Sequence, residues 1–539
     1  MYKILLIAMV LVVCSCSNSP NYDLVIKNGR IIDGTGKPSY SADIAVKNGV
    51  IVEIGKLSSK RAVRTIDAEG FVITPGFIDM MGCDSRPLIR DRISAESKLR
   101  QGITTMMVGE GGSLAPRIPD TSQSDNELET WSTYNEYFSL LEEKGIALNV
   151  IHNVGAAQVR QVVIGDKDQD ANPEQLAQMK SLVEEAMKDG AVGISSALIY
   201  PPGSYATTEE LIELSKISAQ YNGVYFTHVR NESNQLIEAI KEAIHIGKEA
   251  AIPVHIFHLK AAGQENWPLF CEALDLIAMA RSKGLKITSD IYPYTRNGLG
   301  LGAFIHPRHF SDGILEFFKS LSDENVRQQL RYEIENTSDW ENWYQHVGGN
   351  WDNVLVSMVY SDSTRDLVGL SVQEAADKRG EDVWDTFFDL LQNGASVSPK
   401  SMNETQKHQA LRAPFVCFDS DAAPVNPSII PSAHPRAFGS FPRVLVKYVR
   451  EEHIISLEEA IRKMTSLPAS ILSLSSRGII NKGMEADILI FDPEKIQDKA
   501  TFIEPLLYSE GIDYVIINGQ MVIDNGKVTE ALPGKVIRH

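Results

Sequence analysis

Two histidines, each at the end of a predicted strand, restrict the fold of this chain more than any other feature. Residues 224–228 (Val-Tyr-Phe-Thr-His) are apolar, β-branched or aromatic and follow an Asn-Gly pair, which is typical of a buried strand. Residues 231–250 carry apolar side chains at helical spacing, and residues 253–258 (Pro-Val-His-Ile-Phe-His) predict a second strand. A strand, a helix and a strand within about thirty residues form a βαβ unit, whose two strands are parallel.

His228 and His258 are each predicted to be the last residue of one of these strands. Parallel strands point the same way, so both histidines are expected at one rim, where a parallel barrel carries its catalytic groups. Two imidazoles at one rim supply half of a zinc-type site. The alternative is a pair of hydrogen-bonded core or rim histidines, which is the interpretation we favour for His255.

Alternating strands and helices extend over most of the chain and predict an α/β fold. Further strands are predicted at residues 103–108, 147–151, 191–196, 286–289 and 414–418. The best-marked helix has Asn172 as its N-cap and Pro173 in its first turn, and it ends at Gly190. Such repetition favours a (β/α)₈ TIM barrel over about residues 74–477. Residues 308–349 break the pattern, either as an insertion that covers the barrel mouth or as a plain surface excursion.

Asn-Gly turns mark β-hairpins near both ends of the chain. Residues 24–32, 44–54 and 514–523 each place Asn-Gly between two apolar runs, which predicts a type I′ hairpin. Isolated hairpins are marginally stable. We therefore predict that residues 17–73 and 478–539 build one small β domain, with the barrel inserted between them.

The first residues have the pattern of an export signal. Lys3 precedes a short apolar run, residues 4–13, and then Cys14, Ser15 and Cys16. This pattern predicts a bacterial lipoprotein signal, residues 1–16, with lipidation at Cys16 and a membrane-anchored, periplasm-facing protein. The alternatives are an ordinary cleaved signal or a fixed anchor. The three remaining cysteines predict no disulfide scaffold.

The charge balance bears on possible partners. The formal net charge is −18 and the sequence pI is about 5.2. A nucleic-acid partner requires a basic face to neutralise phosphates, so we expect none. The expected membrane contact is through the N-terminal lipid alone, and the expected partner is a small molecule.

Eight short blocks in a fixed order carry a resemblance to a known family. They are residues 75–79 (Pro-Gly-Phe-Ile-Asp), 193–203 (Gly-Ile-Ser-Ser-Ala-Leu-Ile-Tyr-Pro-Pro-Gly), 227–230 (Thr-His-Val-Arg), 258–263 (His-Leu-Lys-Ala-Ala-Gly), 420–421 (Ser-Asp), 434–436 (His-Pro-Arg), 463–469 (Lys-Met-Thr-Ser-Leu-Pro-Ala) and 483–488 (Gly-Met-Glu-Ala-Asp-Ile). Nearly all of the chain after the signal resembles the amidohydrolase superfamily and, within it, the D-aminoacylase (N-acyl-D-amino-acid deacylase) group.

The resemblance implies a fold and a reaction. The fold is a (β/α)₈ barrel flanked by a β-sandwich, and the reaction is zinc-dependent hydrolysis of the N-acyl bond of an N-acyl-D-amino acid. The family's metal histidines fall on His228 and His258, and its general base falls on Asp421. The alternative for Asp421 is a turn residue.

Two departures from the family pattern affect the metal ligands. The family usually has His-x-His after the first block, whereas this chain has Met81-Gly82-Cys83, so we expect one zinc per chain. A thiolate can bind zinc, which makes Cys83 a further candidate. After the second strand the group usually has a cysteine ligand, and here Glu110 stands in a glycine-rich stretch that is one residue shorter. Glu110 would complete a His₂Glu set, and its alternative is an exposed loop glutamate.

The resemblance also implies the substrate contacts. Lys260 and Tyr292 are expected to hold the substrate α-carboxylate, and Tyr200 to line the same pocket or polarise the carbonyl. The alternatives are a surface lysine for Lys260 and a packed aromatic side chain for Tyr292. Arg230, Arg296 and Arg436 would favour an acidic substrate side chain if they point inward, because guanidinium pairs well with carboxylate.

Two other functions remain open at this point. One is a different amidohydrolase activity, an isoaspartyl dipeptidase or a cyclic-amide hydrolase. The other is a non-catalytic binding protein on the same scaffold, which the missing His-x-His suggests. Metal content separates the binding protein from the enzymes, and a substrate panel separates the enzymes from each other.

Overall fold

The computed structural model describes residues 20–57, 61–118 and 130–539. The predicted signal and its Cys16 lie outside these described residues. Within the described ranges, no helix combines the length and the apolar composition needed to cross a membrane.

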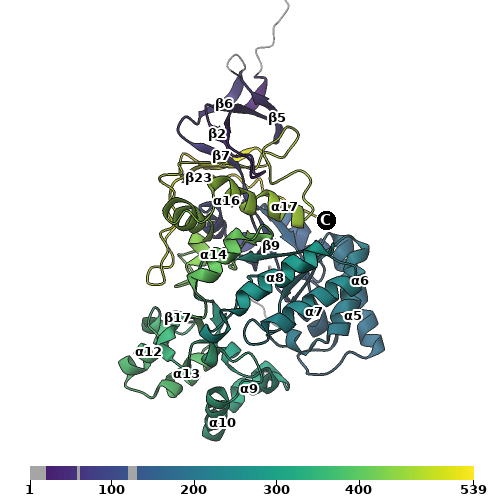
Figure 1. The fold of residues 1–539 in the computed structure, drawn as a ribbon, viewed down its shortest axis with the longest axis vertical. Coiled ribbons are helices and arrows are strands. Elements are labelled where there is room, and N and C mark those ends of the chain that lie inside the picture. The colour runs from purple at the N-terminus through teal and green to yellow at the C-terminus, as the bar shows by residue number, and fades with distance from the viewer. Residues whose placement is uncertain (1–19, 58–60, 119–129) are drawn as a thin grey trace, which may run out of the picture.

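Parallel strands lie at the centre of the molecule, in a three-stranded and a six-stranded sheet (Figure 1). In order they are β8 (Phe77–Asp79), β9 (Ile103–Val108), β10 (Asn149–His152) with β11 (Val154–Gly155), β12 (Gly193–Ala197), β13 (Val224–His228), β14 (Val254–Ile256), β15 (Ile287–Ile291) and β19 (Val416–Phe418). Each pairs in parallel with the next, and β10 and β11 are separated by Asn153 alone. The backbone N–H of Ser420, just after β19, donates to Asp79 Oδ1 at the end of β8 (2.9 Å), which joins the last strand to the first.

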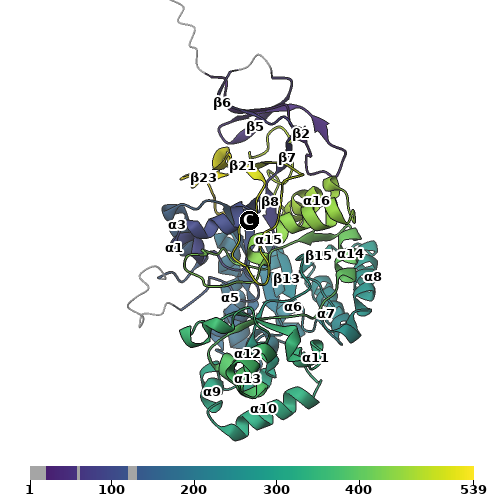
Figure 2. The same cartoon turned by 90° about the vertical axis from the view of Figure 1, so that its left-hand side faces the viewer.

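Helices follow the strands and cover the outside of the barrel (Figures 1 and 2). They are α1 (Arg86–Arg90), α2 (Glu96–Leu99), α3 (Tyr134–Lys144), α4 (Ala156–Val163), α5 (Pro173–Asp189), α6 (Thr208–Gln220), α7 (Leu236–Glu249), α8 (Leu269–Ser282), α14 (Glu404–Arg412), α15 (Arg436–Arg443), α16 (Leu457–Met464) and α17 (Ser466–Ile471). The predicted Asn172 cap and Pro173 start of α5 are both present. The predicted (β/α)₈ barrel is therefore confirmed.

The barrel interior determines where the strand ends point. Met107, Ile151, Phe226 and Phe257 belong to one buried cluster inside the barrel. Side chains alternate along a strand, so His228, two residues after Phe226, points to the same inner side. The interior core thus directs His228 into the mouth of the barrel.

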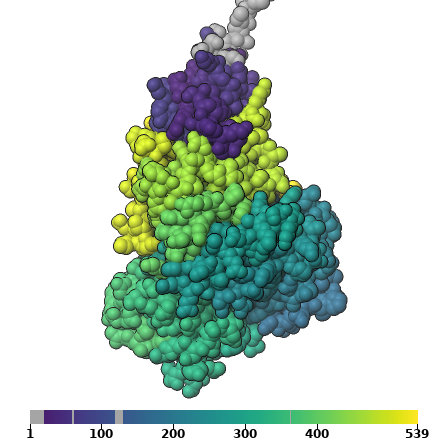
Figure 3. All heavy atoms as spheres, in the orientation of Figure 1, coloured from purple at the N-terminus to yellow at the C-terminus, as the bar shows by residue number. Residues whose placement is uncertain are grey.

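A β-sandwich from both ends of the chain lies at the opposite end of the molecule from the residue 299–399 region (Figures 1 and 3). Its four-stranded sheet contains β5 (Val50–Gly55), β4 (Asp43–Lys47), β1 (Tyr22–Lys27) and β6 (Ala62–Asp67). Its seven-stranded sheet contains β23 (Lys527–Val528), β22 (Gln520–Asp524), β21 (Ile512–Ile517), β20 (Ile488–Phe491), β7 (Val72–Pro75), β2 (Arg30–Ile31) and β3 (Tyr40–Ser41). Isoleucines and valines of both sheets form one core.

Two of the three predicted hairpins are confirmed, and one is wrong. β4 pairs with β5, and β21 with β22, and the turn residues Asn48, Gly49, Asn518 and Gly519 all have positive φ. β1 and β2 instead lie in different sheets. A type I′ turn needs two residues with positive φ, and of the pair Asn28-Gly29 only Asn28 has it (φ 61°). An added Cβ on Gly29 would lie 2.2 Å from Ile73, so the glycine serves close packing at this corner.

The predicted insertion is longer than residues 308–349. A separate subdomain runs from β16 (Leu299–Gly300) to β18 (Ser396–Pro399) and has its own hydrophobic core. Its other elements are α9 (Ile314–Ser320), α10 (Glu324–Asn336), α11 (Trp343–His346), β17 (Val354–Met358), α12 (Val372–Arg379) and α13 (Val383–Gln392). β16, β18 and β17 pair into a sheet, so the true boundaries depend on strands that meet only in the folded chain.

Candidate metal centre

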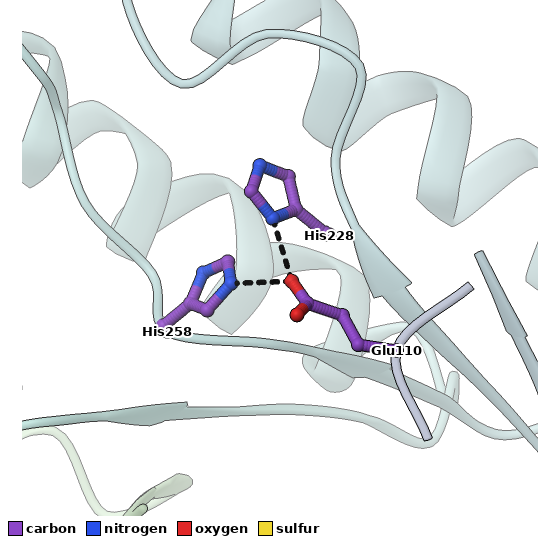
Figure 4. Close-up of side chains that lie close together, drawn as sticks. All are labelled: Glu110, His228 and His258. Atoms are coloured by element: carbon purple, nitrogen blue, oxygen red, sulfur yellow. Dashed lines mark hydrogen bonds and ion pairs between the residues drawn. The ribbon is translucent and has the colours of Figure 1, made fainter. Parts of the chain in front are cut away.

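Glu110, His228 and His258 converge on one point at the barrel mouth (Figure 4). Glu110 Oε1 lies 2.8 Å from His228 Nδ1 and 3.1 Å from His258 Nε2. One donor atom from each residue lies within 4.8 Å of the others. Two imidazole nitrogens and one carboxylate oxygen at such distances are the donor set of a zinc site with an open position.

The backbone brings each of the three side chains to this point. His228 is the last residue of β13, as predicted. His258, in contrast, lies two residues beyond β14 with φ 34°, and its N–H donates to Asp290 Oδ1 instead of continuing the ladder. Glu110 lies in a turn in which the Gly111 N–H donates to Ser195 Oγ (2.9 Å). An added Cβ on Gly111 would lie 2.5 Å from the Ala197 nitrogen, so this turn requires glycine.

The local charges favour a cation. Burial raises the pKa of Glu110, but contacts with His228 and His258 outweigh it and hold the pKa well below its usual value. Burial and Lys260 lower the pKa of His258, yet Glu232 and Glu110 raise it to about 9. Two carboxylates around two imidazoles therefore stabilise positive charge here, and the residues present fit a divalent metal.

Glu232 is a buried carboxylate that the sequence did not indicate. It is 2% exposed, and its Oε1 lies 3.1 Å from His258 Nδ1. Lys260 Nζ donates to the same oxygen. The Glu232 N–H donates to Oε2 of Glu341 in the residue 299–399 subdomain (3.2 Å). The only sequence signal is that Glu232 stands four residues after His228. Because the chain leaves a strand at His228, this spacing does not indicate that the two side chains lie together.

Asp421 faces the same centre and is held by a positive charge. Arg436 Nη1 lies 2.5 Å from Asp421 Oδ2. Burial raises the pKa of Asp421, and Arg436 and His258 oppose this only in part. The preceding Ser420 is fixed by Asp79 and by the buried Lys98 ammonium, which donates to Ser420 Oγ (2.6 Å) and pairs with Asp79 (2.9 Å). This network holds the loop that carries Asp421.

A small cavity of about 40 Å³ unites the predicted catalytic and substrate residues. Its lining comprises Glu110, Tyr200, His228, Glu232, His258, Lys260, Tyr292, Asn297, Gly298, Leu299, Trp343 and Asp421. The Tyr292 ring is flanked by Lys407 Nζ at 4.8 Å and by Arg436 Cζ at 4.9 Å. Among the lining residues, Lys260 carries a cationic group that suits a substrate carboxylate, while Lys407 and Arg436 pack against the Tyr292 ring.

Larger cavities adjoin this small one. One of about 760 Å³ shares Tyr200 and Trp343 with it, and one of about 590 Å³ shares Asp421 and Leu299. Leu299 and Trp343 belong to the 299–399 subdomain. Of the two predicted roles for the insertion, the position of these side chains supports the cover over the barrel mouth.

Three predicted site residues do not line the cavity of the metal centre. Cys83 does not join the ligand group found in the described chain; its Sγ lies 3.7 Å from Asp421 Oδ1, and burial followed by Asp421 and Glu110 raises its thiol pKa well above the usual value. Arg230 is held by Glu242 (2.9 Å) and by main-chain carbonyls, and it lines only the larger cavity. Arg296 donates to the carbonyls of Asn353 (2.8 Å) and Ser398 (2.9 Å), so it ties the subdomain to the barrel.

Comparison with known proteins agrees with this architecture. The model of the amidohydrolase family matches residues 405–523. A D-aminoacylase of Alcaligenes xylosoxydans xylosoxydans is 32% identical over 97% of this chain and 99% of its own length. The structure of N-acyl-D-glutamate deacylase from Bordetella bronchiseptica, complexed with zinc and a phosphonate mimic of the tetrahedral intermediate, superposes with a TM-score of 0.81 and 28% identity, covering 96% of this chain and 100% of that one.

A further structural relative is a D-aminoacylase with a binuclear metal centre, described as activated by one metal and attenuated by a second. Its TM-score is 0.81 at 29% identity, over 96% of this chain and 100% of that one. Sequence identity, full-length coverage and fold all agree. This chain therefore belongs to the amidohydrolases, in the group of the D-aminoacylases and N-acyl-D-amino-acid deacylases.

Proposed function

We propose that this protein hydrolyses the N-acyl amide bond of N-acyl-D-amino acids with one zinc ion per chain. The observation that carries the proposal is the convergence of Glu110, His228 and His258 in one cavity with Asp421. The amide class and the D configuration rest on the relatives, which are a D-aminoacylase and an N-acyl-D-glutamate deacylase.

The residues of this chain divide the reaction between them. Zinc held by Glu110, His228 and His258 would supply the polarisation of the acyl carbonyl and of the attacking water. Asp421 accepts a proton from the water and returns it to the leaving amine, which yields a carboxylate and a free D-amino acid. Arg436 holds Asp421 Oδ2, which leaves Oδ1 to carry the proton. Lys260 and Tyr292 bind the substrate carboxylate beside it.

Three observations on this chain support a single metal. Met81 is buried in the barrel core, and Cys83 lies outside the ligand group found in the described residues. The arginine on Asp421 already supplies a positive charge on the side of Cys83. The related D-aminoacylase is likewise activated by one metal.

Zinc content and stereospecific hydrolysis test this function together. The purified protein without residues 1–16 is expected to hold about one zinc per chain and to release free amino acid from N-acetyl-D-amino acids but not from the L forms. Elemental analysis and an amino-acid assay on the same preparation measure both. Two zinc ions per chain would contradict the single-metal proposal. No zinc and no turnover would leave the alternative of a binding protein.

A substrate panel distinguishes the remaining enzymes. An isoaspartyl dipeptide or a cyclic amide that reacts faster than every N-acetyl-D-amino acid would favour the other amidohydrolase activities. Cavities of about 760 and 590 Å³ share lining residues with the cavity of the centre, which supports space for an extended acyl amino acid.

We also propose that the protein is exported and anchored in a membrane by lipid at Cys16. The support is the sequence pattern of residues 3–17. In a bacterial host the full chain is expected to incorporate labelled palmitate, and Cys16→Ser is expected to abolish the label. Cys14→Ser is the matched control and should keep it. A label that persists in Cys16→Ser would refute this anchor.

A further inference from the structure

Glu232 contacts the outer nitrogens of both candidate metal-binding imidazoles. Glu110 occupies the inner side, at His228 Nδ1 and His258 Nε2. On the outer side Glu232 Oε1 lies 3.1 Å from His258 Nδ1, and Glu232 Oε2 lies 3.6 Å from His228 Nε2. Each imidazole is therefore enclosed between two carboxylates, one at each ring nitrogen.

The contact with His228 is not yet a hydrogen bond. A separation of 3.6 Å exceeds the usual limit for one. Both atoms, His228 Nε2 and Glu232 Oε2, are buried and have no other hydrogen-bond partner among the described residues. Buried polar atoms without partners are costly, so a small rotation of either side chain that pairs them is favourable.

The chemistry of a metal-binding histidine explains this arrangement. An imidazole that binds a metal through one nitrogen carries its proton on the other. A carboxylate that accepts a hydrogen bond from this N–H fixes the tautomer and the orientation of the ring. The nitrogens that face Glu110 are His228 Nδ1 and His258 Nε2, which are opposite nitrogens of the two rings. A single acceptor with two oxygens, placed behind both rings, can satisfy both requirements.

We propose that Glu232 is a positioning residue of the metal centre. Its two carboxylate oxygens accept hydrogen bonds from the N–H groups of both metal-binding imidazoles. This inference rests on the proposed zinc function of Glu110, His228 and His258. It gives Glu232 a role that is distinct from metal ligation, because its oxygens face the ring nitrogens that point away from Glu110.

The backbone of Glu232 is held firmly enough for such a role. Its N–H donates to Glu341 Oε2 (3.2 Å), and its carbonyl accepts the N–H of Ala262 (2.7 Å). Glu341 belongs to the 299–399 subdomain, and Ala262 follows His258 and Lys260. The cover over the barrel mouth and the loop that carries the second imidazole thus fix the same residue.

Glu232 also connects the metal centre to the substrate site. Lys260 Nζ donates to Glu232 Oε1 and lies 2.7 Å from His258 Nδ1. Once Nδ1 carries the proton that metal binding requires, Lys260 can no longer donate to it and keeps Glu232 as its partner. The same oxygen therefore orients the His258 ring and holds the lysine that is expected to bind the substrate carboxylate.

Zinc affinity without substrate tests the proposal. Glu232→Gln keeps the side-chain shape, but its amide offers one acceptor oxygen in place of two. We expect the zinc dissociation constant of the apoprotein, measured by competition with a chromophoric chelator, to rise by about 10- to 100-fold. Glu232→Asp keeps the charge but shortens the reach, so it is also expected to weaken zinc binding.

Two controls separate positioning from other effects. Glu210 is another buried carboxylate, which pairs with Arg160 (2.7 Å) away from the centre, and Glu210→Gln should leave the zinc affinity within about twofold, as expected for a distant, independent site. Lys260→Met should raise KM without weakening zinc binding, because it removes a positive charge beside His258. This pattern would show that Glu232 acts on the imidazoles and not merely through Lys260 or through the fold.

Parent-like zinc affinity in a folded Glu232→Gln or Glu232→Asp protein would overturn the proposal. A parent protein that binds zinc but hydrolyses no N-acyl-D-amino acid would contradict the proposed function, while the zinc affinities would still decide the role of Glu232. A parent protein that binds no zinc would overturn both.

Discussion

Replacing Asp421 by asparagine is expected to lower kcat for an N-acetyl-D-amino acid by about 10²- to 10⁴-fold, the contribution typical of general acid–base catalysis. Asparagine keeps the shape of the side chain but cannot accept a proton from water. Arg436 holds Oδ2 at 2.5 Å, so the variant removes the proton acceptor without emptying the cavity. Zinc content should stay at the parent value, because Asp421 lies outside the ligand group found in the described residues.

A matched variant shows whether this loss is specific. Asp498 also pairs with an arginine, Arg443 (3.1 Å), and its side chain is 9% exposed, compared with 11% for Asp421. Asp498 does not line the cavity of the metal centre. Asp498→Asn is therefore expected to leave kcat within about twofold, as for a site that shares no partners with the centre. Asp421→Asn with parent-like kcat would exclude Asp421 as the proton acceptor.

Glu110→Ala is expected to remove the metal from the enzyme. Two imidazoles alone lack the third ligand of a catalytic zinc site. The zinc dissociation constant should rise by more than about 100-fold, which is the upper range for losing a residue that only hydrogen-bonds to a metal ligand. Hydrolysis should disappear with the metal. Zinc per chain after dialysis, together with kcat at saturating zinc, measures the effect. Millimolar zinc should restore at most a small part of the activity.

The control for Glu110 is a carboxylate near the same rim. Glu242 pairs with Arg230 (2.9 Å) and its side chain is 13% exposed, but it does not belong to the ligand group of the described chain. Glu242→Ala should keep about one zinc per chain. If Glu110→Ala also keeps its zinc and its activity, the third ligand is a different residue. Equal loss of zinc in both variants would indicate a general disturbance of the rim.

Much of the fold could be predicted because its signals are local. The βαβ unit around His228 follows from strand and helix periodicity within one short stretch. The hairpins at Asn48 and Asn518 follow from turn chemistry, because Asn-Gly accepts the two left-handed residues of a type I′ turn. The Asn-Gly pair at Asn28 does not form a hairpin. The strands on either side of it, β1 and β2, join different sheets, and local turn chemistry does not determine which sheet a strand joins.

The candidate site could be predicted only in part. His228 was placed by strand position alone, and Glu110, Lys260, Tyr292 and Asp421 by resemblance to the family. The sequence predicts Arg296 near the substrate, but its guanidinium donates hydrogen bonds to the carbonyls of Asn353 and Ser398 in the subdomain. No local pattern reveals such long-range partners.

Local sequence patterns are sufficient to predict the order of strands and helices, the barrel with its β domain, and the strand end that carries His228. These features depend on periodicity and turn preference, which act over a few residues. Three features emerge only from long-range contacts in the folded chain: Glu232 lies behind both imidazoles, Arg436 holds Asp421, and Leu299 and Trp343 of the subdomain line the cavity of the metal centre. The physical reason is distance along the chain: Glu232 and Glu341 are 109 residues apart, and packing alone brings them into contact.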